Sequence, residues 1–198
     1  MIQSPTFCVT AFAHANLLQI CIDSIKRFYP GSRIIISQQV NDESEIDIDG
    51  TEKIYHDMKT NNWSEVAIGL LEKCDTKVAV FIEHDALLLN HLDNYIELIE
   101  NGEYDLIGPE EVIPFDKLNR HAPGMVTQNF FILNAQKMKE IGLDNVRFKD
   151  GDEYRDYINK ESGYGISQSL DKKLFMPVTK SNYAHGTYYG SEVFHLWY

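Results

Sequence analysis

Two carboxylates separated by one residue, Glu83 and Asp85, follow a nearly uninterrupted apolar run that begins at Val78. A short run rich in β-branched and aromatic residues is typical of a strand that is buried on both faces. Polar groups at the carboxyl end of such a strand lie where open α/β sheets bind their ligands. Two acidic groups placed there are costly to desolvate unless a cation or protons compensate their charge. The pattern predicts a divalent-metal site at the strand end, with a phosphate as the group that the metal holds.

The segments around this tip alternate between strand and helix patterns. Strands are predicted for residues 6–12, 33–37, 77–82, 104–108, 128–133 and 174–178, and helices for residues 16–29, 62–73, 91–100, 135–141 and 166–172. Residues 41–52 are interpreted as a solvated acidic loop, and residues 145–165 as polar and loop-like. Residues 181–198 show little period. Strand–helix alternation predicts an α/β, Rossmann-like domain with a mostly parallel, twisted central sheet flanked by helices.

Length and composition narrow the classes of function. The 198 residues fit a single domain, and the aromatic end without a polar tail favours one module of a longer polypeptide. The net charge of −12 argues against a nucleic-acid partner, because binding to a phosphate backbone depends on clustered Lys and Arg side chains. There is neither a secretory signal pattern nor an apolar stretch of about 18 residues that would predict a membrane span. Three cysteines without metal-ligand spacing indicate buried thiols in a reducing, cytoplasmic compartment.

Several motifs occur in an order that a known enzyme family shares. The Glu83-His84-Asp85 tip resembles an Asp-x-Asp (DXD) motif in which Glu replaces the first Asp, and Gly124 lies in a glycine-containing loop before a strand. Together with the opening strand and helix at residues 10–28 and a helix end at residues 138–143, these motifs resemble glycosyltransferases of the GT-A fold. The small family-2-like members are the most similar. The resemblance covers most of the chain and implies a single GT-A-like domain over residues 1–198.

What the resemblance implies is a metal-dependent hexosyl- or deoxyhexosyltransferase. It would move a sugar from a nucleoside diphosphate sugar, a UDP-sugar by analogy, to a hydroxyl of a glycan or another acceptor. A divalent cation would stabilise the charge that develops on the diphosphate leaving group. Carboxylate and imidazole ligands suit Mn²⁺ or Mg²⁺. The implied ligands are Asp85 directly, Glu83 directly or through a water, and His185 as the third, with His195 as the alternative to His185.

The resemblance also implies residues for catalysis and for the donor. Glu161 falls where the family places an x-Glu-Asp motif that carries the catalytic base. The usual Asp is Ser162 here, which leaves Asp150, Asp152 and Glu153 as alternative bases and leaves a retaining mechanism open. Phe12 and Trp63 can instead belong to the core, and His84 is either structural or near the sugar. The residues expected to contact the nucleotide or the donor sugar are Ala11, Phe12, His14, Asp42, Asn62, Trp63, Glu83, His84 and Gly124.

Other functions remain as alternatives at this point. Ser162 allows a catalytically inactive module that binds a nucleotide or a sugar. The adjacent His84-Asp85 pair suggests a metal-dependent phosphohydrolase, although the apolar strand pattern before it disfavours the helical enzymes of that class. A nucleotidyltransferase is disfavoured because residues 10–14 contain no glycine-rich loop and no basic residue other than histidine. Candidate acceptor contacts are Glu110, Glu111, Tyr188 and Tyr189.

Overall fold

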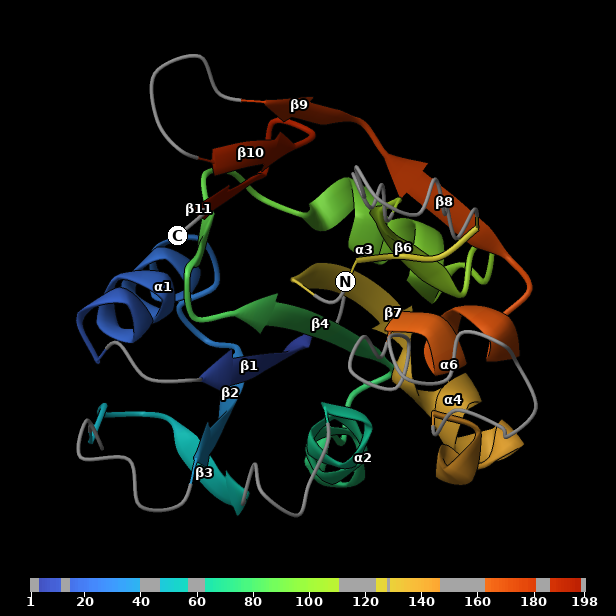
Figure 1. The fold of residues 1–198 in the computed structure, drawn as a ribbon, viewed down its shortest axis with the longest axis horizontal. Helices are drawn as coiled ribbons and strands as arrows, with labels where there is room; N and C mark the ends of the chain where they lie inside the picture. The colour runs from blue at the N-terminus through green and yellow to red at the C-terminus, as the bar shows by residue number, and fades with distance from the viewer. Residues whose placement is uncertain are drawn as a thin grey trace, which may run out of the picture.

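The structure is a computed structural model that describes residues 4–11, 15–39, 47–56, 63–110, 124–127, 129–146, 163–180 and 186–196. A seven-stranded sheet with the order β3-β2-β1-β4-β7-β6-β8 forms its centre (Figure 1). β7 runs antiparallel to both of its neighbours, and the other neighbouring pairs are parallel. The strands are β1 (Thr6–Ala11), β2 (Arg33–Gln39), β3 (Glu52–His56), β4 (Val78–Glu83), β6 (Leu106–Pro109), β7 (Phe130–Asn134) and β8 (Lys173–Met176).

Helices cover both faces of this sheet. On one face, α1 inserts Leu18, Ile22 and Ile25 into a core that it shares with α3. These spacings of three and four residues place the apolar side chains on one side of the helix. On the other face, α2, α4, η1 and α6 build a second core around Phe81 and Phe131. The bounds are α1 (Ala15–Phe28), α2 (Trp63–Lys73), α3 (Asp93–Glu100), α4 (Ala135–Ile141), the 3₁₀ helix η1 (Leu143–Val146) and α6 (Gly163–Ser169).

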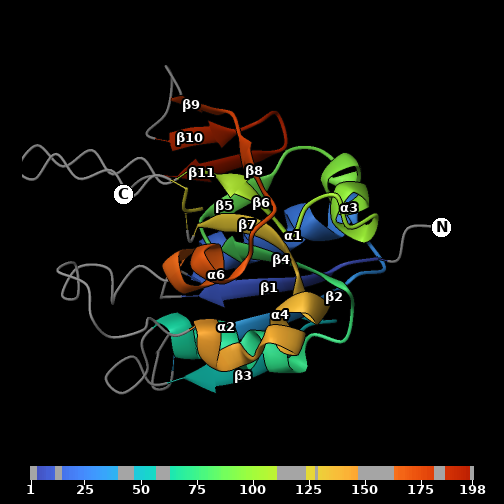
Figure 2. The ribbon, with the colours of Figure 1, turned by 90° about the vertical axis from the view of Figure 1, so that its right-hand side faces the viewer.

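A small second sheet lies on the α1 and α3 side of the central sheet (Figure 2). It contains β5 (Ala86–Leu88), β11 (Val193–Leu196), β10 (Gly186–Tyr189) and β9 (Val178–Lys180), in that order, and all of its pairs are antiparallel. Its inner side chains, among them Leu88, Tyr189 and Val193, join the core that contains α1. This sheet positions the C-terminal part of the chain against the tip of β4.

The predicted α/β class with a mostly parallel central sheet flanked by helices is confirmed. The interpretation of residues 41–52 as a solvated loop is wrong at its end, because Ile48 is buried and Glu52 begins β3. Residues 181–198, whose sequence shows little period, contain β10 and β11. β5 was not expected either. Of the helices in the described segments, none combines the length and the apolar character that crossing a membrane requires.

Candidate functional site

The site begins where β4 ends. Glu83 is the last residue of β4 and lies beside Thr10 of β1 in the sheet. The backbone N–H of His84 still donates to the carbonyl of Thr10, at 3.0 Å, but the chain then turns and enters β5 at Ala86. The apolar run from Val78 to Leu89 is therefore two strands in two different sheets. Glu83 and Asp85 lie on either side of His84 in this turn, and both are buried.

β11 brings His195 to this turn. His195 lies opposite Ala86 in the antiparallel β5–β11 pair, and the N–H of Leu196 donates to the carbonyl of Asp85 at 3.1 Å. Alternation along β11 places Val193 and His195 on the buried side of the small sheet. The imidazole is fixed next to the two acids by strand pairing rather than by closeness in the sequence.

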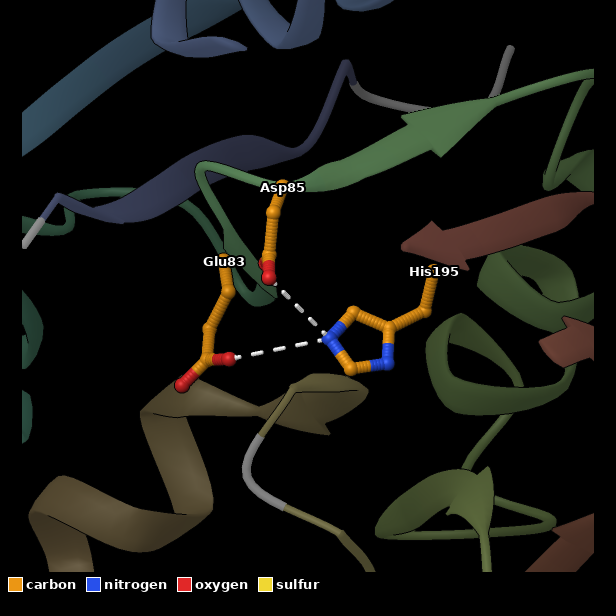
Figure 3. Close-up of side chains that lie close together, drawn as sticks. All are labelled: Glu83, Asp85 and His195. Carbon is orange, nitrogen blue, oxygen red and sulfur yellow. Dashed lines mark ion pairs between the residues drawn. The ribbon is translucent and has the colours of Figure 1, made fainter. Parts of the chain in front are cut away.

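The three side chains point toward one another (Figure 3). His195 Nε2 lies 3.4 Å from Asp85 Oδ2 and 4.0 Å from Glu83 Oε2. The exposed fraction is 8% for Glu83, 9% for Asp85 and 6% for His195, and one ligand atom from each lies within 4.8 Å of the others. Asp85 Oδ1 is buried and accepts no hydrogen bond in the described part of the chain. Two carboxylates, one imidazole and an unsatisfied oxygen fit a divalent cation such as Mn²⁺ or Mg²⁺.

Neighbouring groups support this cluster. The side chain of Asn129 donates to Glu83 Oε2, and the hydroxyl of Tyr189 lies 3.2 Å from His195 Nδ1. Beneath the turn, the Cys21 thiol donates to the carbonyl of Glu83 at 3.6 Å. Burial, and to a lesser degree the charge of Asp85, raises the pKa of Cys21, so this residue is a neutral thiol and adds no third negative charge.

Four other residues expected at the donor site lie in the described segments. Ala11 ends β1, with its side chain in the core beneath α1. The ring of Trp63 is 4% exposed and packs against Phe81 and Phe131, with ring centroids 6.0 Å apart in both cases. His84 is buried in the turn between β4 and β5. Gly124 has a φ of 85°, which favours glycine, and its N–H donates to the Glu110 carboxylate at 3.1 Å.

The remaining predicted residues lie outside the part of the chain that the structure describes. The positions outside the described residues are Phe12, His14, Asp42, Asn62, Asp152, Glu161 and His185. Glu111 and the alternative bases Asp150 and Glu153 are also outside. Of the two proposed histidine ligands, His195 is the one that the described structure places beside the acids. The two tyrosines proposed as acceptor contacts lie on opposite sides of β10. Tyr189 contacts His195, whereas Tyr188 is 36% exposed.

Two residues of the site were not predicted from the sequence. Asn129 was interpreted as part of a strand over residues 128–133, whereas β7 begins one residue after it. Thr10 lies beside Glu83, and its buried hydroxyl makes no hydrogen bond within the described residues. The available signal was the interruption of an apolar strand pattern by a polar residue at the ligand-binding end of the sheet.

Gly186 permits the close pairing that fixes His195. A Cβ at this position would lie 2.6 Å from the carbonyl oxygen of His195 and 2.4 Å from Cζ of Phe194. We expect Gly186→Ala to displace β11 and to lower the free energy of unfolding by about 1–3 kcal/mol, as overpacking does. Urea unfolding monitored by circular dichroism would measure this change. Gly31→Ala is the control, because a Cβ there meets no atom within 4 Å, and an equal effect of both variants would contradict the packing argument.

Known proteins resemble this chain in structure. A galactosyltransferase, LgtC, in complex with donor and acceptor sugar analogues, is 12% identical, with a TM-score of 0.62 over 86% of this chain and 73% of that chain. S. aureus TarS 1–349 in complex with UDP is 9% identical, with a TM-score of 0.60 over 86% of this chain and 57% of that chain. The bifunctional IspDF from Campylobacter jejuni is 17% identical, with a TM-score of 0.57 over 89% of this chain and 50% of that chain.

At these identities the likeness concerns the fold. The chain has the GT-A fold that glycosyltransferases such as LgtC and TarS share. It spans little more than half the length of the TarS fragment and half of IspDF. No protein-family model matches the sequence, and no curated protein matches it by sequence.

Proposed function

We propose that this protein is a metal-dependent glycosyltransferase. It transfers a hexosyl or deoxyhexosyl group from a nucleoside diphosphate sugar, a UDP-sugar by preference, to a hydroxyl of a glycan or another acceptor. The observation that carries the proposal is the convergence of Glu83, Asp85 and His195 at the carboxyl end of β4 in a GT-A fold. LgtC was solved with donor and acceptor sugar analogues and TarS with UDP and with UDP-GlcNAc, which supports this class of ligand.

The chemistry of the site follows from its donor set. Asp85 and Glu83 would hold the cation through carboxylate oxygens, and His195 through Nε2. When bound, the cation would act as a Lewis acid that stabilises the charge developing on the diphosphate leaving group. The burial of all three side chains restricts competing water and strengthens their electrostatic interactions. The hydroxyl of Thr10 lies beside Glu83 and makes no hydrogen bond within the described residues. It would donate a hydrogen bond to an oxygen of the bound nucleotide sugar.

The base that activates the acceptor is not placed by the described residues, so Glu161 and Asp152 stay proposals for this role. Gly124, Ala11 and Trp63 stay proposals for the donor site. We also propose that the protein acts in the cytoplasm as a single domain. All three cysteines are free and buried, as expected of thiols in a reducing compartment.

Thermal unfolding with UDP, with and without Mn²⁺, tests the proposal. If the cation bridges the protein and the diphosphate, UDP stabilises the protein only when Mn²⁺ is present. A concentration of about 100 times Kd would add roughly 2.7 kcal/mol, or an increase in Tm of about 5–10 °C. GDP and TDP, measured in parallel, test the preference for uracil.

Two outcomes would change the conclusion. Equal stabilisation by UDP in EDTA would contradict the metal-dependent site. Stabilisation by UDP and Mn²⁺ without release of UDP from any of a panel of UDP-sugars and glycan acceptors would favour the inactive binding module. Release of inorganic phosphate from UDP would instead favour the phosphohydrolase.

A further inference from the structure

Two of the three cysteines lie together beneath the C-terminal end of α2. Cys74 directly follows Lys73, the last residue of α2, and Cys8 lies in the middle of β1. Both belong to the core that α2 covers, and the exposed fraction is 0% for Cys8 and 1% for Cys74. The Cys8 thiol donates a hydrogen bond to the sulfur of Cys74. The fold therefore brings into contact two thiols that are far apart in the sequence.

Thr76 fixes the position of this pair. Its hydroxyl oxygen lies 3.5 Å from Cys74 Sγ and 2.9 Å from Thr6 Oγ1. The same oxygen accepts the backbone N–H of Thr6 at 3.1 Å. Thr6 and Cys8 are alternate residues of β1 and therefore lie on the same face of the sheet. These contacts hold the residue that follows α2 against the first half of β1.

The surroundings of the pair favour one thiolate and one thiol. The hydrogen bond from Cys8 has the largest effect on Cys74 and lowers the pKa of this group to about 6, although burial opposes the shift. Burial, and in addition the same hydrogen bond, raises the pKa of Cys8. Lys139 Nζ donates to the carbonyl of Cys74. Arg33 Nη1 donates to the carbonyl of Lys73 at 2.6 Å, so two cations surround the end of α2. Cys74 is therefore the nucleophile of the pair.

We propose that Cys74 and Cys8 form a peroxide-sensitive dithiol that closes to an intrachain disulfide. In the first step the Cys74 sulfur attacks one oxygen of hydrogen peroxide. An S–O bond forms, the O–O bond breaks, and the products are a sulfenic acid and a hydroxide ion. In the second step the Cys8 sulfur attacks the Cys74 sulfur, so that the S–S bond forms and the S–O bond breaks. The Cys8 proton leaves with the departing hydroxide as water. Both sulfurs are oxidised and one molecule of peroxide is reduced.

The oxidant reaches Cys74 from the end of α2. Cys74 is buried, but the side chains of its neighbours Lys73 and Asp75 are exposed. Helix ends open more readily than helix centres, and such an opening admits a molecule as small as hydrogen peroxide. The disulfide would tie this end of α2 to β1, while Trp63 begins α2 at its other end. The inference does not rest on the proposed function, because it involves no residue of the cation site.

Peptide mapping of the oxidised native protein tests the proposal. The reduced protein is treated with hydrogen peroxide, unfolded in the presence of iodoacetamide, digested, and analysed by mass spectrometry. We expect a linked peptide pair that contains Cys8 and Cys74, and its loss after treatment with dithiothreitol. Cys21 is the internal control, because it is buried in the other core, beneath α1, and should be recovered in the alkylated form. Three alkylated cysteines after peroxide treatment, or a disulfide that involves Cys21, would overturn the proposal.

Two serine variants test the order of the steps. Cys8→Ser keeps a hydrogen-bond donor but removes the second thiol, so we expect a sulfenic acid at Cys74 that dimedone captures. In Cys74→Ser we expect Cys8 to stay reduced, and oxidation of Cys8 at the native rate would contradict the role of Cys74.

Thermal unfolding of the native protein is a further readout, which serves if a serine variant does not fold. Because the disulfide closes a long loop without displacing its two elements, oxidation should raise Tm by about 5–15 °C. Dithiothreitol should reverse the increase. A lower Tm after oxidation would show that the two sulfurs are not placed for this bond.

Discussion

Replacement of Asp85 by asparagine should lower sugar transfer by about three orders of magnitude while the protein stays folded. That loss corresponds to roughly 4 kcal/mol of transition-state stabilisation, the several kcal/mol expected when a Lewis-acid cation is lost. Folding should change by less than about 1 kcal/mol, because the substitution removes one of two neighbouring buried carboxylates at constant shape. Release of UDP from UDP-sugars and urea unfolding would measure the two quantities.

Asp171→Asn is the matched control, since this aspartate is exposed and lies outside the site. It should retain both activity and stability. Full turnover in Asp85→Asn would show that Asp85 does not hold the cation. A loss of activity that accompanies unfolding of the variant would show instead that the carboxylate is structural.

The largest effect on stability is expected at Phe81, in the middle of β4. Phe81 is 1% exposed, and its ring stacks on Phe131 with centroids 4.7 Å apart and contacts Trp63. Phe81→Ala would leave a cavity that the surrounding sheet and helix can close only in part. The free energy of unfolding should therefore fall by about 3–5 kcal/mol. We expect the midpoint of urea unfolding to fall accordingly, with an unchanged denaturant slope.

Phe175→Ala provides the comparison, because Phe175 in the edge strand β8 is 36% exposed. Its cost should stay below about 1 kcal/mol. If the two substitutions had similar effects, the core between the central sheet and α2 would not be packed as described.

The central sheet was predictable because its inner strands are apolar on both faces. All six residues of β1 and all six of β4 are buried. Such an apolar run predicts a buried strand from the local sequence alone, without knowledge of the strands that pair with it. β3 carries Glu, Lys and His among its five residues and pairs on one side with β2. An edge strand of this composition has no apolar run to reveal it, which explains why its start was assigned to a loop.

The small sheet was not predictable for a different reason. β5, β9, β10 and β11 have three or four residues each, and none is long enough to show a period. Their stability comes from pairing between distant parts of the chain, as in the β5–β11 pair that sets His195 against Ala86. Local sequence patterns do not contain that information.

In the site as well, residues that are close in the sequence were predictable, whereas residues brought there by strand pairing were not. Glu83 and Asp85 share one turn, so their closeness followed from their spacing alone. His195 was a candidate only through the resemblance, and there His185 was the preferred third ligand and His195 the alternative. Asn129 depended on where β7 begins, which a strand pattern locates only to within a few residues.

Diffraction data collected at the manganese absorption edge, from crystals grown with Mn²⁺ and UDP, test the central claim most directly. The account predicts an anomalous peak enclosed by Glu83, Asp85 and His195 Nε2, with diphosphate oxygens of UDP bound to the same ion. UDP bound with no peak between these side chains, or an ion held elsewhere on the protein, would contradict it.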